Sequence, residues 1–259
     1  MTQGALAGRV AIVTGAGTGV GTAIARLYAQ EGAGVVLCGR RAALLHEAAD
    51  SLTAAGHDRC LVVSGDVSQE AAVDALFAQT LDRFGRVDIL VNNAAVAGPT
   101  GPIWDLSLED FQETIAINLG GPWLCCRAAA KVMRPQRSGR IINIGSITGK
   151  RPLAARSPYA ASKLGLVGLT RTLAVELGES NITVNHISPG PIDTPRLEEL
   201  AQAKKRPLQE FIAPFIAASA LKRISRPEDI AELALFLAGD RARNITGVDI
   251  NVDGGIWFS

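Results

Sequence analysis

The sequence predicts an α/β fold in which helices cover both faces of one parallel sheet. Seven short β-branched or apolar runs alternate with helical stretches, at residues 10–13, 35–37, 61–63, 87–91, 141–144, 182–187 and 248–252. Most of these runs are continuously apolar, which is typical of strands that are buried on both faces of a parallel sheet. Alternation of strands and helices with right-handed crossovers predicts a single doubly wound sheet of about seven strands.

The first helix is expected directly after the first strand. Val20, Ile24 and Leu27 recur at helical spacing, and Gly32 follows as a stop signal. The remaining helices fill the gaps between the other strands. Because no Pro/Ser-rich linker, low-complexity tract or internal repeat divides the chain, we predict one domain over residues 1–259.

Two of the predicted helical regions are apolar on more than one side. Residues 122–133 include Trp123 and Leu124 and carry little charge. Residues 160–177 are surrounded by the apolar side chains Leu164, Leu166, Val167, Leu169, Leu173, Val175 and Leu177. A helix of this kind is buried on several sides. We therefore expect a homo-oligomer, a dimer or a tetramer, that covers these faces, with a large core as the alternative.

Composition and charge exclude several classes of partner. The 26 Lys+Arg and 25 Asp+Glu residues give a net charge of +1, which provides no basic surface for nucleic acid or an anionic membrane. The four cysteines lack CxxC spacing and the three histidines are scattered, so we expect neither a disulfide framework nor a metal site. Without a recognisable signal peptide or membrane span, the expected location is the cytoplasm.

A glycine-rich turn separates the first strand from the first helix. Residues 14–21 read TGAGTGVG, with glycine at positions 15, 17, 19 and 21. Glycine permits a tight turn and lets backbone N–H groups approach a pyrophosphate at the helix N-terminus. The spacing is TGxxxGxG rather than GxGxxG, and the Lys-Ser or Lys-Thr of a P-loop is missing. The turn is typical of dinucleotide binding, with a tight connection that binds no ligand as the alternative.

Tyr159 and Lys163 form a second motif, because residues four apart share one face of a helix. A neighbouring cation favours tyrosinate, so the phenol, with a reference pKa of about 10, is expected to exchange protons nearer neutral pH. A Tyr and a Lys four residues apart also occur often on ordinary amphipathic helices that have no catalytic role. Ser146, however, lies thirteen residues before Tyr159 at the end of a predicted strand, where doubly wound sheets place ligand groups. This position favours a catalytic site.

With these motifs in order, the sequence resembles the short-chain dehydrogenase/reductase family over essentially the whole chain. The resemblance rests on TGxxxGxG at 14–21, Asp66, NNAA at 92–95, Asn118, Ser146, YxxxK at 159–163, and Pro189-Gly190 followed by Thr194. It implies a Rossmann-type fold and an oxidoreductase that moves a hydride between a nicotinamide cofactor and a carbonyl or secondary alcohol. It further implies a dinucleotide-binding part at 8–95, a catalytic part at 96–190, a substrate lid at 191–225, and a final helix and strand at 226–259.

The resemblance also implies roles for individual residues. Tyr159 would be the acid/base and Ser146 would hydrogen-bond the substrate oxygen. Lys163 would lower the Tyr159 pKa and bind the nicotinamide ribose, and Asn118 would hold a water that links Lys163 to solvent. Ile192 and Thr194 would hold the carboxamide and Asp66 the adenine. The implied cofactor-binding residues are Gly15, Gly17, Thr18, Gly19, Val20, Gly21, Arg40, Arg41, Asp66, Val67, Asn93, Ala94, Tyr159, Lys163, Pro189, Gly190, Ile192 and Thr194.

One departure from the family pattern is Ala95, which stands where the family usually has glycine. A methyl group at this position matters only if the backbone is tight or needs a positive φ. The neighbouring asparagines of the motif are intact, so we expect the substitution to be tolerated.

The end of the second strand distinguishes the two nicotinamide cofactors. NAD-preferring members usually place a carboxylate there to accept from the ribose 2′-OH, and this chain has Gly39 followed by Arg40 and Arg41. A guanidinium suits a 2′-phosphate, which favours NADP(H). NAD(H) is the alternative, since some relatives with a similar Gly-Arg ending use it.

Substrate identity stays open at the level of sequence. The cations Lys150, Arg151 and Arg156 lie between Ser146 and Tyr159, and they either attract an anionic substrate or are ordinary loop charges. A hydrophobic ketone, a 3-oxoacyl thioester and a sugar or polyol all remain open. The alternatives to an NADP(H)-dependent carbonyl reductase or alcohol dehydrogenase are an NAD-dependent alcohol, sugar or hydroxyacyl dehydrogenase, a catalytically silent dinucleotide-binding regulator, and an S-adenosylmethionine methyltransferase, which has no use for the Tyr/Lys pair.

Overall fold

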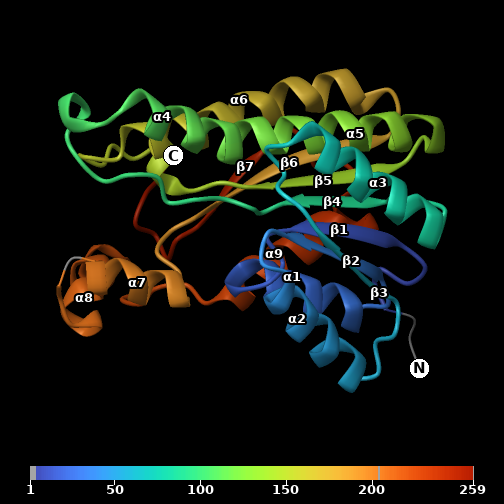
Figure 1. Ribbon diagram of the computed structural model, residues 1–259, viewed down its shortest axis with the longest axis horizontal. Coiled ribbons are helices and arrows are strands. Elements are labelled where there is room, and N and C mark those ends of the chain that lie inside the picture. The colour runs from blue at the N-terminus through green and yellow to red at the C-terminus, as the bar shows by residue number, and fades with distance from the viewer. Residues whose placement is uncertain (1–3, 204, 259) are drawn as a thin grey trace.

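The computed structural model describes residues 4–203 and 205–258, so residues 1–3, 204 and 259 of the predicted domain lie outside the described residues. Within that range the chain forms one seven-stranded parallel sheet in the order β3-β2-β1-β4-β5-β6-β7 (Figure 1). The strands are β1 Val10–Thr14, β2 Gly34–Gly39, β3 Cys60–Ser64, β4 Ile89–Asn92, β5 Gly139–Ile144, β6 Ile182–Pro189 and β7 Asp249–Val252. Each of the seven predicted runs overlaps one of them, and the predicted doubly wound sheet is confirmed.

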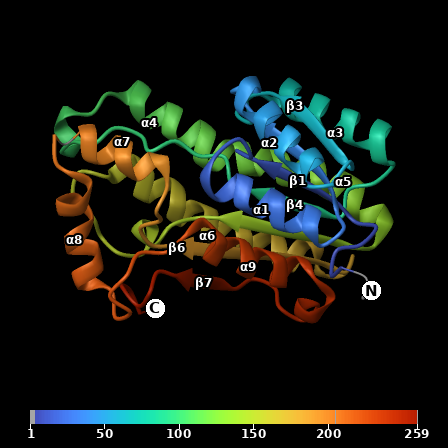
Figure 2. The ribbon, with the colours of Figure 1, turned by 90° about the horizontal axis from the view of Figure 1, so that it is seen from below.

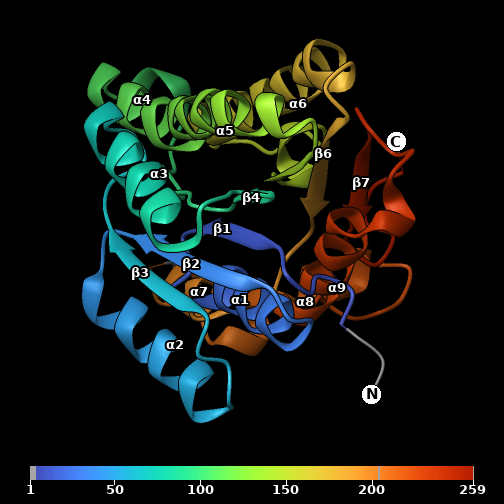
Figure 3. The ribbon, with the colours of Figure 1, turned by 90° about the vertical axis from the view of Figure 1, so that its right-hand side faces the viewer.

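Helices cover both faces of this sheet, as Figure 3 shows. One face carries α1 Gly19–Gln30, α2 Ala42–Ala54 and α9 Pro227–Ala238. The other carries α3 Glu70–Phe84, α4 Leu108–Ile115, α5 Gly121–Gln136 and α6 Ser157–Gly178. Double coverage explains why every residue of β1, β5 and β6 is buried, the polar side chains of β5 and β6 included, and why β1 has a continuous apolar run.

The core is divided by the sheet into two clusters. Ile24, Tyr28 and Ile230 belong to the cluster beneath α1 and α9, where the fully buried Tyr28 donates its hydroxyl to the Ala234 carbonyl at 2.8 Å. Phe77 and Met133 belong to the cluster beneath α3 and α5. The described cysteines are all free thiols, and burial raises the pKa of Cys126 to about 12. Packing rather than disulfides therefore holds the two layers on the sheet.

The final crossover differs from the expected right-handed connections. α6 joins β5 to β6 on the face that carries α5, whereas α9 leads to β7 on the opposite face, against α1. Since β6 and β7 are added in the same direction across the sheet, the last connection has the opposite hand. The intervening helices α7 Pro195–Ala203 and α8 Leu208–Ala218 make it a long excursion rather than the short strand–helix–strand unit for which right-handedness is the rule.

Those two helices stand apart from the sheet at one end of the molecule (Figure 2). β6 ends at Pro189 and leads directly to α7, so α7 and α8 lie at the edge where the parallel strands have their C-terminal ends. α8 buries only Ile212 among its residues, and its Phe211 and Phe215 rings pack edge to face at 5.8 Å. This loosely attached unit occupies the region predicted as a lid.

The outer faces of α5 and α6 expose large apolar side chains. Trp123, Leu164 and Val175 are 48%, 52% and 82% exposed, which accounts for the all-round apolar character of these helices in the sequence. Across residues 4–203 and 205–258, no helix is long and apolar enough to cross a membrane. The same residues gather no group of three or more His, Cys, Asp or Glu side chains suited to a metal ion.

Candidate active site

The C-terminal ends of the parallel strands bring the predicted site residues to one edge of the sheet. The glycine-rich turn follows β1, Arg40 follows β2, Asp66 follows β3 and Ser146 follows β5. Residues this far apart in sequence meet because parallel strands end at a common edge, which is where doubly wound sheets bind their ligands.

The turn after β1 requires glycine at two positions for different reasons. Gly15 adopts a φ of +66°, and a Cβ there would lie 2.9 Å from the Ala94 Cα. A Cβ on Gly21 would lie 2.2 Å from the Gly15 carbonyl oxygen. Asn93 secures the same turn, since its Nδ2 donates to the Thr14 and Gly15 carbonyls at 2.9 and 3.1 Å. The predicted cofactor residue Asn93 thus has a structural task that sequence reasoning missed.

The turn presents the N-terminus of α1 to the site. The helix begins at Gly19, Thr18 does not cap it with its side chain, and its first turn contains no acidic residue. First-turn N–H groups have no partner within a helix and attract anions. The side chain of Val20 is buried in the core, so that residue offers only its backbone to a ligand. A pyrophosphate fits this open helix end and the glycine cradle before it.

Three polar side chains border the far end of the turn. Arg40 Nη1 lies 3.8 Å from Asp66 Oδ2, and Arg41 Nη2 donates to Thr18 Oγ1 at 3.4 Å. Asp66 is held by Ser68, whose backbone N–H and hydroxyl donate to Oδ1 at 2.9 and 2.8 Å. The predicted adenine and 2′-phosphate residues therefore lie beside one another.

The residues after β3 and β4 contribute mainly through their backbone. Val67 is buried, and a Cβ on Gly121 would lie 2.7 Å from its Cγ2, so the Val67 side chain packs under α5. Ala94 donates its backbone N–H to Thr14 Oγ1 at 3.1 Å. Ala95 is not among the described residues with positive φ, which explains how alanine replaces the usual glycine.

Tyr159 and Lys163 lie one turn apart on α6. Lys163 is 3% exposed, its Nζ donates to the Ile144 carbonyl at 2.9 Å, and Nζ lies 5.7 Å from the centre of the Tyr159 ring. Because Ile144 ends β5, this hydrogen bond ties the Lys163 side chain to the strand that leads to Ser146. The ammonium is held between the phenol and the end of that strand.

Ser146 begins the short helix η3 Ile147–Gly149 and accepts the Thr148 N–H at 3.1 Å. This turn rests directly on α6, since a Cβ on Gly149 would lie 2.8 Å from the Leu164 backbone nitrogen. Gly149 thus permits the close approach that brings the serine loop against the helix of Tyr159 and Lys163. Sequence reasoning did not identify this glycine.

Asn118 lies in a π-helical turn, η2 Ala116–Gly120, between α4 and α5. Its side chain is fully buried, accepts the Val96 N–H at 2.8 Å, and donates to the Val96 carbonyl and to Ser162 Oγ at 3.0 and 3.2 Å. Turns of this kind occur often at functional sites. Here the side chain links the segment after β4 to α6, one residue before Lys163.

The segment after β6 closes the remaining side. Pro189 ends β6, and Gly190 packs so closely on the residue after β7 that a Cβ would lie 2.8 Å from the Asp253 Cβ. Ile192 pairs with Ser225 in an isolated parallel bridge. Thr194 reaches the glycine-rich turn, with its Cγ2 3.3 Å from the position of a Cβ on Gly19.

Comparisons with known proteins agree with this arrangement. A family model described as enoyl-(acyl carrier protein) reductase matches residues 15–257. The (2S)-[(R)-hydroxy(phenyl)methyl]succinyl-CoA dehydrogenase subunit of Thauera aromatica is 40% identical over 95% of this chain and 96% of that protein. The cis-4-hydroxycyclohexanecarboxylate dehydrogenase of Sinomonas cyclohexanicum is 40% identical over 97% of each chain.

Among solved structures, that of levodione reductase superimposes with a TM-score of 0.93, at 35% identity over 96% of this chain and 97% of that one. The chain belongs to the short-chain dehydrogenase/reductase family. It is an oxidoreductase with a Rossmann fold, and the resemblance inferred from its motifs is confirmed.

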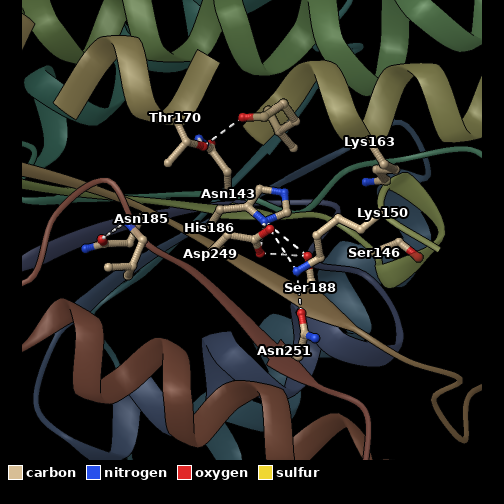
Figure 4. A network of polar contacts seen from close by, with 12 residues as sticks. Asn143, Ser146, Lys150, Lys163, Thr170, Asn185, His186, Ser188, Asp249 and Asn251 are labelled. Carbon is tan, nitrogen blue, oxygen red and sulfur yellow. Dashed lines mark hydrogen bonds and ion pairs between the residues drawn. The ribbon is translucent and has the colours of Figure 1, made fainter. Parts of the chain in front are cut away.

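This short-chain dehydrogenase/reductase also contains a buried polar cluster that the motifs did not indicate (Figure 4). Asp249 Oδ1 lies 2.8 Å from His186 Nδ1 and accepts the Ser188 hydroxyl at 2.8 Å, while Oδ2 lies 2.9 Å from Lys150 Nζ. Lys150 also donates to Asn251 Oδ1. We refer to these five residues as the Asp249 cluster.

The charge states of the cluster follow from its burial. Burial lowers the pKa of His186, and the nearby ammonium groups of Lys163 and Lys150 act in the same direction against the opposing effect of Asp249. Burial raises the pKa of Asp249, but hydrogen bonds from His186, Lys150 and Ser188 outweigh it and hold that pKa well below its ordinary range. Neutral His186 therefore lies beside an ion pair of Lys150 and Asp249.

Proposed function

We propose that this chain transfers a hydride between a nicotinamide cofactor and the carbon of a ketone or secondary alcohol, with Tyr159 as the acid/base. The observation that carries the proposal is the seating of the Ser146 turn on α6 at Gly149, beside Tyr159 and Lys163. Two hydroxyl groups and an ammonium on adjoining elements suit a substrate oxygen that gains or loses a proton.

The residues of the chain divide this chemistry among them. When bound, the reduced nicotinamide supplies the hydride. Tyr159 gives its phenolic proton to the substrate oxygen, and Ser146 donates a hydrogen bond to the same oxygen. Lys163, held by the Ile144 carbonyl, favours the tyrosinate that remains. In the oxidative direction the same groups act in reverse.

Tyr159→Phe tests the acid/base role, and the chain offers a matched control. Its other tyrosine, Tyr28, is fully buried against Ala234 and remote from the site. We expect Tyr159→Phe to lower kcat about 10²- to 10⁴-fold while nucleotide binding, followed by fluorescence, is kept. Tyr28→Phe should cost stability and leave kcat unchanged. Comparable turnover in the Tyr159 variant would contradict the assignment and favour a silent dinucleotide-binding regulator.

We propose NADP(H) as the preferred cofactor and NAD(H) as the weaker one. The end of β2 has no carboxylate, and the guanidinium of Arg41 lies at hydrogen-bond distance from Thr18 on the glycine-rich turn. Arg40 lies on the other side, near Asp66. Two planar donor groups beside a hydroxyl suit a phosphate on the ribose.

We further propose a substrate that carries an anionic group. The guanidinium carbon of Arg156 lies 4.8 Å from the centre of the Tyr159 ring, and Nη1 donates to Thr100 Oγ1 at 3.0 Å. A cation is thus held at the rim of the proposed oxygen site. The names of two relatives, a hydroxycyclohexanecarboxylate dehydrogenase and a substituted succinyl-CoA dehydrogenase, describe substrates with such groups.

A panel of substrates tests this proposal through the absorbance of reduced nicotinamide. It contains a cyclic keto acid, its neutral methyl ester, a 3-oxoacyl thioester and the corresponding enoyl thioester, each with both cofactors. We expect the keto acid or the 3-oxoacyl thioester to be reduced with a higher kcat/KM than the ester. Reduction of the enoyl thioester alone would instead favour the activity described by the matching family model.

We also propose that the exposed apolar faces of α5 and α6 meet in a homo-oligomer, either a dimer or a tetramer. Trp123, Leu164 and Val175 lie on these faces. Light scattering of the purified chain, compared with a Leu164→Asp variant, measures the mass directly. A monomeric wild-type protein would contradict the proposal.

A further inference from the structure

The Asp249 cluster lies along one face of the last two strands. His186 and Ser188 on β6 are register partners of Asp249 and Asn251 on β7, so these four alternate residues belong to the same face. Lys150 enters from the loop that follows β5 and η3, and closes the ion pair with Asp249 (Figure 4). Three elements therefore meet at one buried carboxylate.

This carboxylate is linked to both ends of the loop that carries Ser146. At the start of the loop, Gly145 donates its N–H to the Ile187 carbonyl at 2.7 Å and lies against the His186 ring, where a Cβ would be 2.0 Å from Nε2. At the end of the loop, Lys150 is bound to Asp249 and Asn251. Asp249 thus fixes the His186 ring, which lies against Gly145, and the ammonium group of Lys150, which follows Gly149.

The burial of the Asp249 cluster favours one position of the loop that carries Ser146. The side chains of Lys150 and Asp249 are only 15% and 6% exposed, and His186 is fully buried. A buried carboxylate needs polar partners, and here a ring N–H and a hydroxyl hydrogen-bond Oδ1 while the Lys150 ammonium forms an ion pair with Oδ2. Because these partners come from β6 and from the Ser146 loop, the loop has one favoured position against β7.

The same burial separates Lys150 from the substrate. Its Nζ is engaged by Asp249 and Asn251 beneath the loop, whereas Arg156 lies on the ring of Tyr159. The sequence position of Lys150, between Ser146 and Tyr159, is equally consistent with an anion-binding cation. The structure directs this ammonium to β7 instead.

We propose that Lys150 and Asp249 are positioning residues, which hold the Ser146 hydroxyl in place for the reaction through the loop 145–150. This inference rests on the proposed function, because it takes Ser146 as the group that contacts the substrate oxygen. Displacement of a catalytic group by about 1 Å can cost about 10²-fold in rate. Loss of the ion pair should therefore lower kcat about 10- to 100-fold, with KM and cofactor binding changed far less.

A double-mutant cycle tests the coupling to Ser146. The variants are Ser146→Ala, Asp249→Asn and the two combined, with kcat referred to the concentration of cofactor-binding sites found by fluorescence titration. If Asp249 acts through Ser146, Asp249→Asn costs 10- to 100-fold in the wild-type background and close to nothing in the Ser146→Ala background. An equal loss in both backgrounds, or no loss in either, would overturn the inference.

A second pair of variants covers the case in which Asp249→Asn fails to fold. Lys150→Met removes the ammonium, whereas Lys150→Arg keeps a cation that reaches Asp249. We expect the arginine variant to recover at least part of the kcat that the methionine variant loses. Equal activity of the two variants would count against positioning by charge.

A matched control neutralises another paired carboxylate. Asp240 forms an ion pair at 2.5 Å with Arg9, the residue before β1. This pair lies at the end of the sheet opposite the site, so Asp240→Asn should leave kcat unchanged. The proposed function and the inference fail in different ways. Full turnover by Ser146→Ala would refute the role of the serine, whereas a slow Ser146→Ala variant with an additive Asp249→Asn effect would refute only the positioning.

Discussion

The environment of His186 predicts that the protein loses stability on mild acidification. The ring is fully buried, and its Nδ1 lies 2.8 Å from a carboxylate that can only accept, so the proton of the neutral ring resides on Nδ1. Nε2 faces Gly145 and has no hydrogen-bond partner among the described residues. Protonation would bury an N–H group without an acceptor next to Lys150 and Lys163, which is why the pKa of His186 is lowered.

The sign and size of the effect follow from proton linkage. Below about pH 6.5 an unfolded histidine binds a proton, and it does so more readily than His186 in the folded chain, whose pKa is lowered, so acid favours the unfolded state. A histidine that stays neutral in the folded chain throughout this range lowers the free energy of unfolding by about 1.4 kcal/mol between about pH 7.5 and about pH 5.5, which is the upper bound for His186. For a domain of this size that upper bound corresponds to a fall of about 3–6 °C in Tm. Asp249 adds a loss in the same direction only below about pH 3.9.

Urea unfolding at these two pH values measures the difference. His186→Asn keeps a donor near the position of Nδ1 but cannot titrate, so its free energy of unfolding should fall less than that of the wild type, by up to about 1.4 kcal/mol. His46→Asn is the matched control, because it makes the same substitution at an exposed histidine. Equal pH dependence in the wild type and His186→Asn would refute the linkage, whatever the absolute stability of the variant.

Three further substitutions probe the rest of the site. Arg40→Asp removes a hydrogen-bond donor and adds a negative charge that repels the 2′-phosphate of NADPH. The kcat/KM with NADPH should therefore fall at least about 10-fold, while that with NADH is kept or rises. Gly21→Ala places a Cβ 2.2 Å from the Gly15 carbonyl oxygen, so it should weaken cofactor binding at least about 10-fold in a fluorescence titration and cost about 1–3 kcal/mol of stability. Arg156→Gln should raise KM for an anionic substrate and leave KM for a neutral ester unchanged, whereas Arg151→Gln should leave both KM values unchanged. An unchanged cofactor preference, cofactor affinity or KM would contradict each prediction in turn.

The sheet was predictable because burial on both faces imposes a simple pattern. Every residue of β1 is buried, and the run at 10–13 records this directly in the sequence. The hand of the last crossover was not predictable in the same way. The reversal depends on α7 and α8, through which the chain leaves the sheet after β6 before α9 packs against α1. No local sequence pattern encodes that path.

The motifs placed the candidate site but not all of the tasks of its residues. Asn93 belongs to a recognisable asparagine pair, yet its Nδ2 secures the glycine-rich turn through two backbone carbonyls. Gly149 has no motif, and its importance arises from a backbone contact with α6. Such tasks depend on distances between elements, which residue types and spacing do not specify.

The Asp249 cluster shows most clearly that residue types and spacing do not specify contacts between elements. His186 and Asp249 are 63 residues apart, and only the parallel register of β6 and β7 makes them partners. Lys150 and Arg156 lie on one loop between the same two motif residues, yet one ammonium is buried against β7 and the other cation lies on Tyr159. The difference arises because Lys150 follows the η3 turn that rests on α6, whereas Arg156 follows Ala155, whose φ of +63° redirects the chain at the start of that helix. Backbone path therefore decides which of two similar charges supports the serine loop and which faces the proposed substrate.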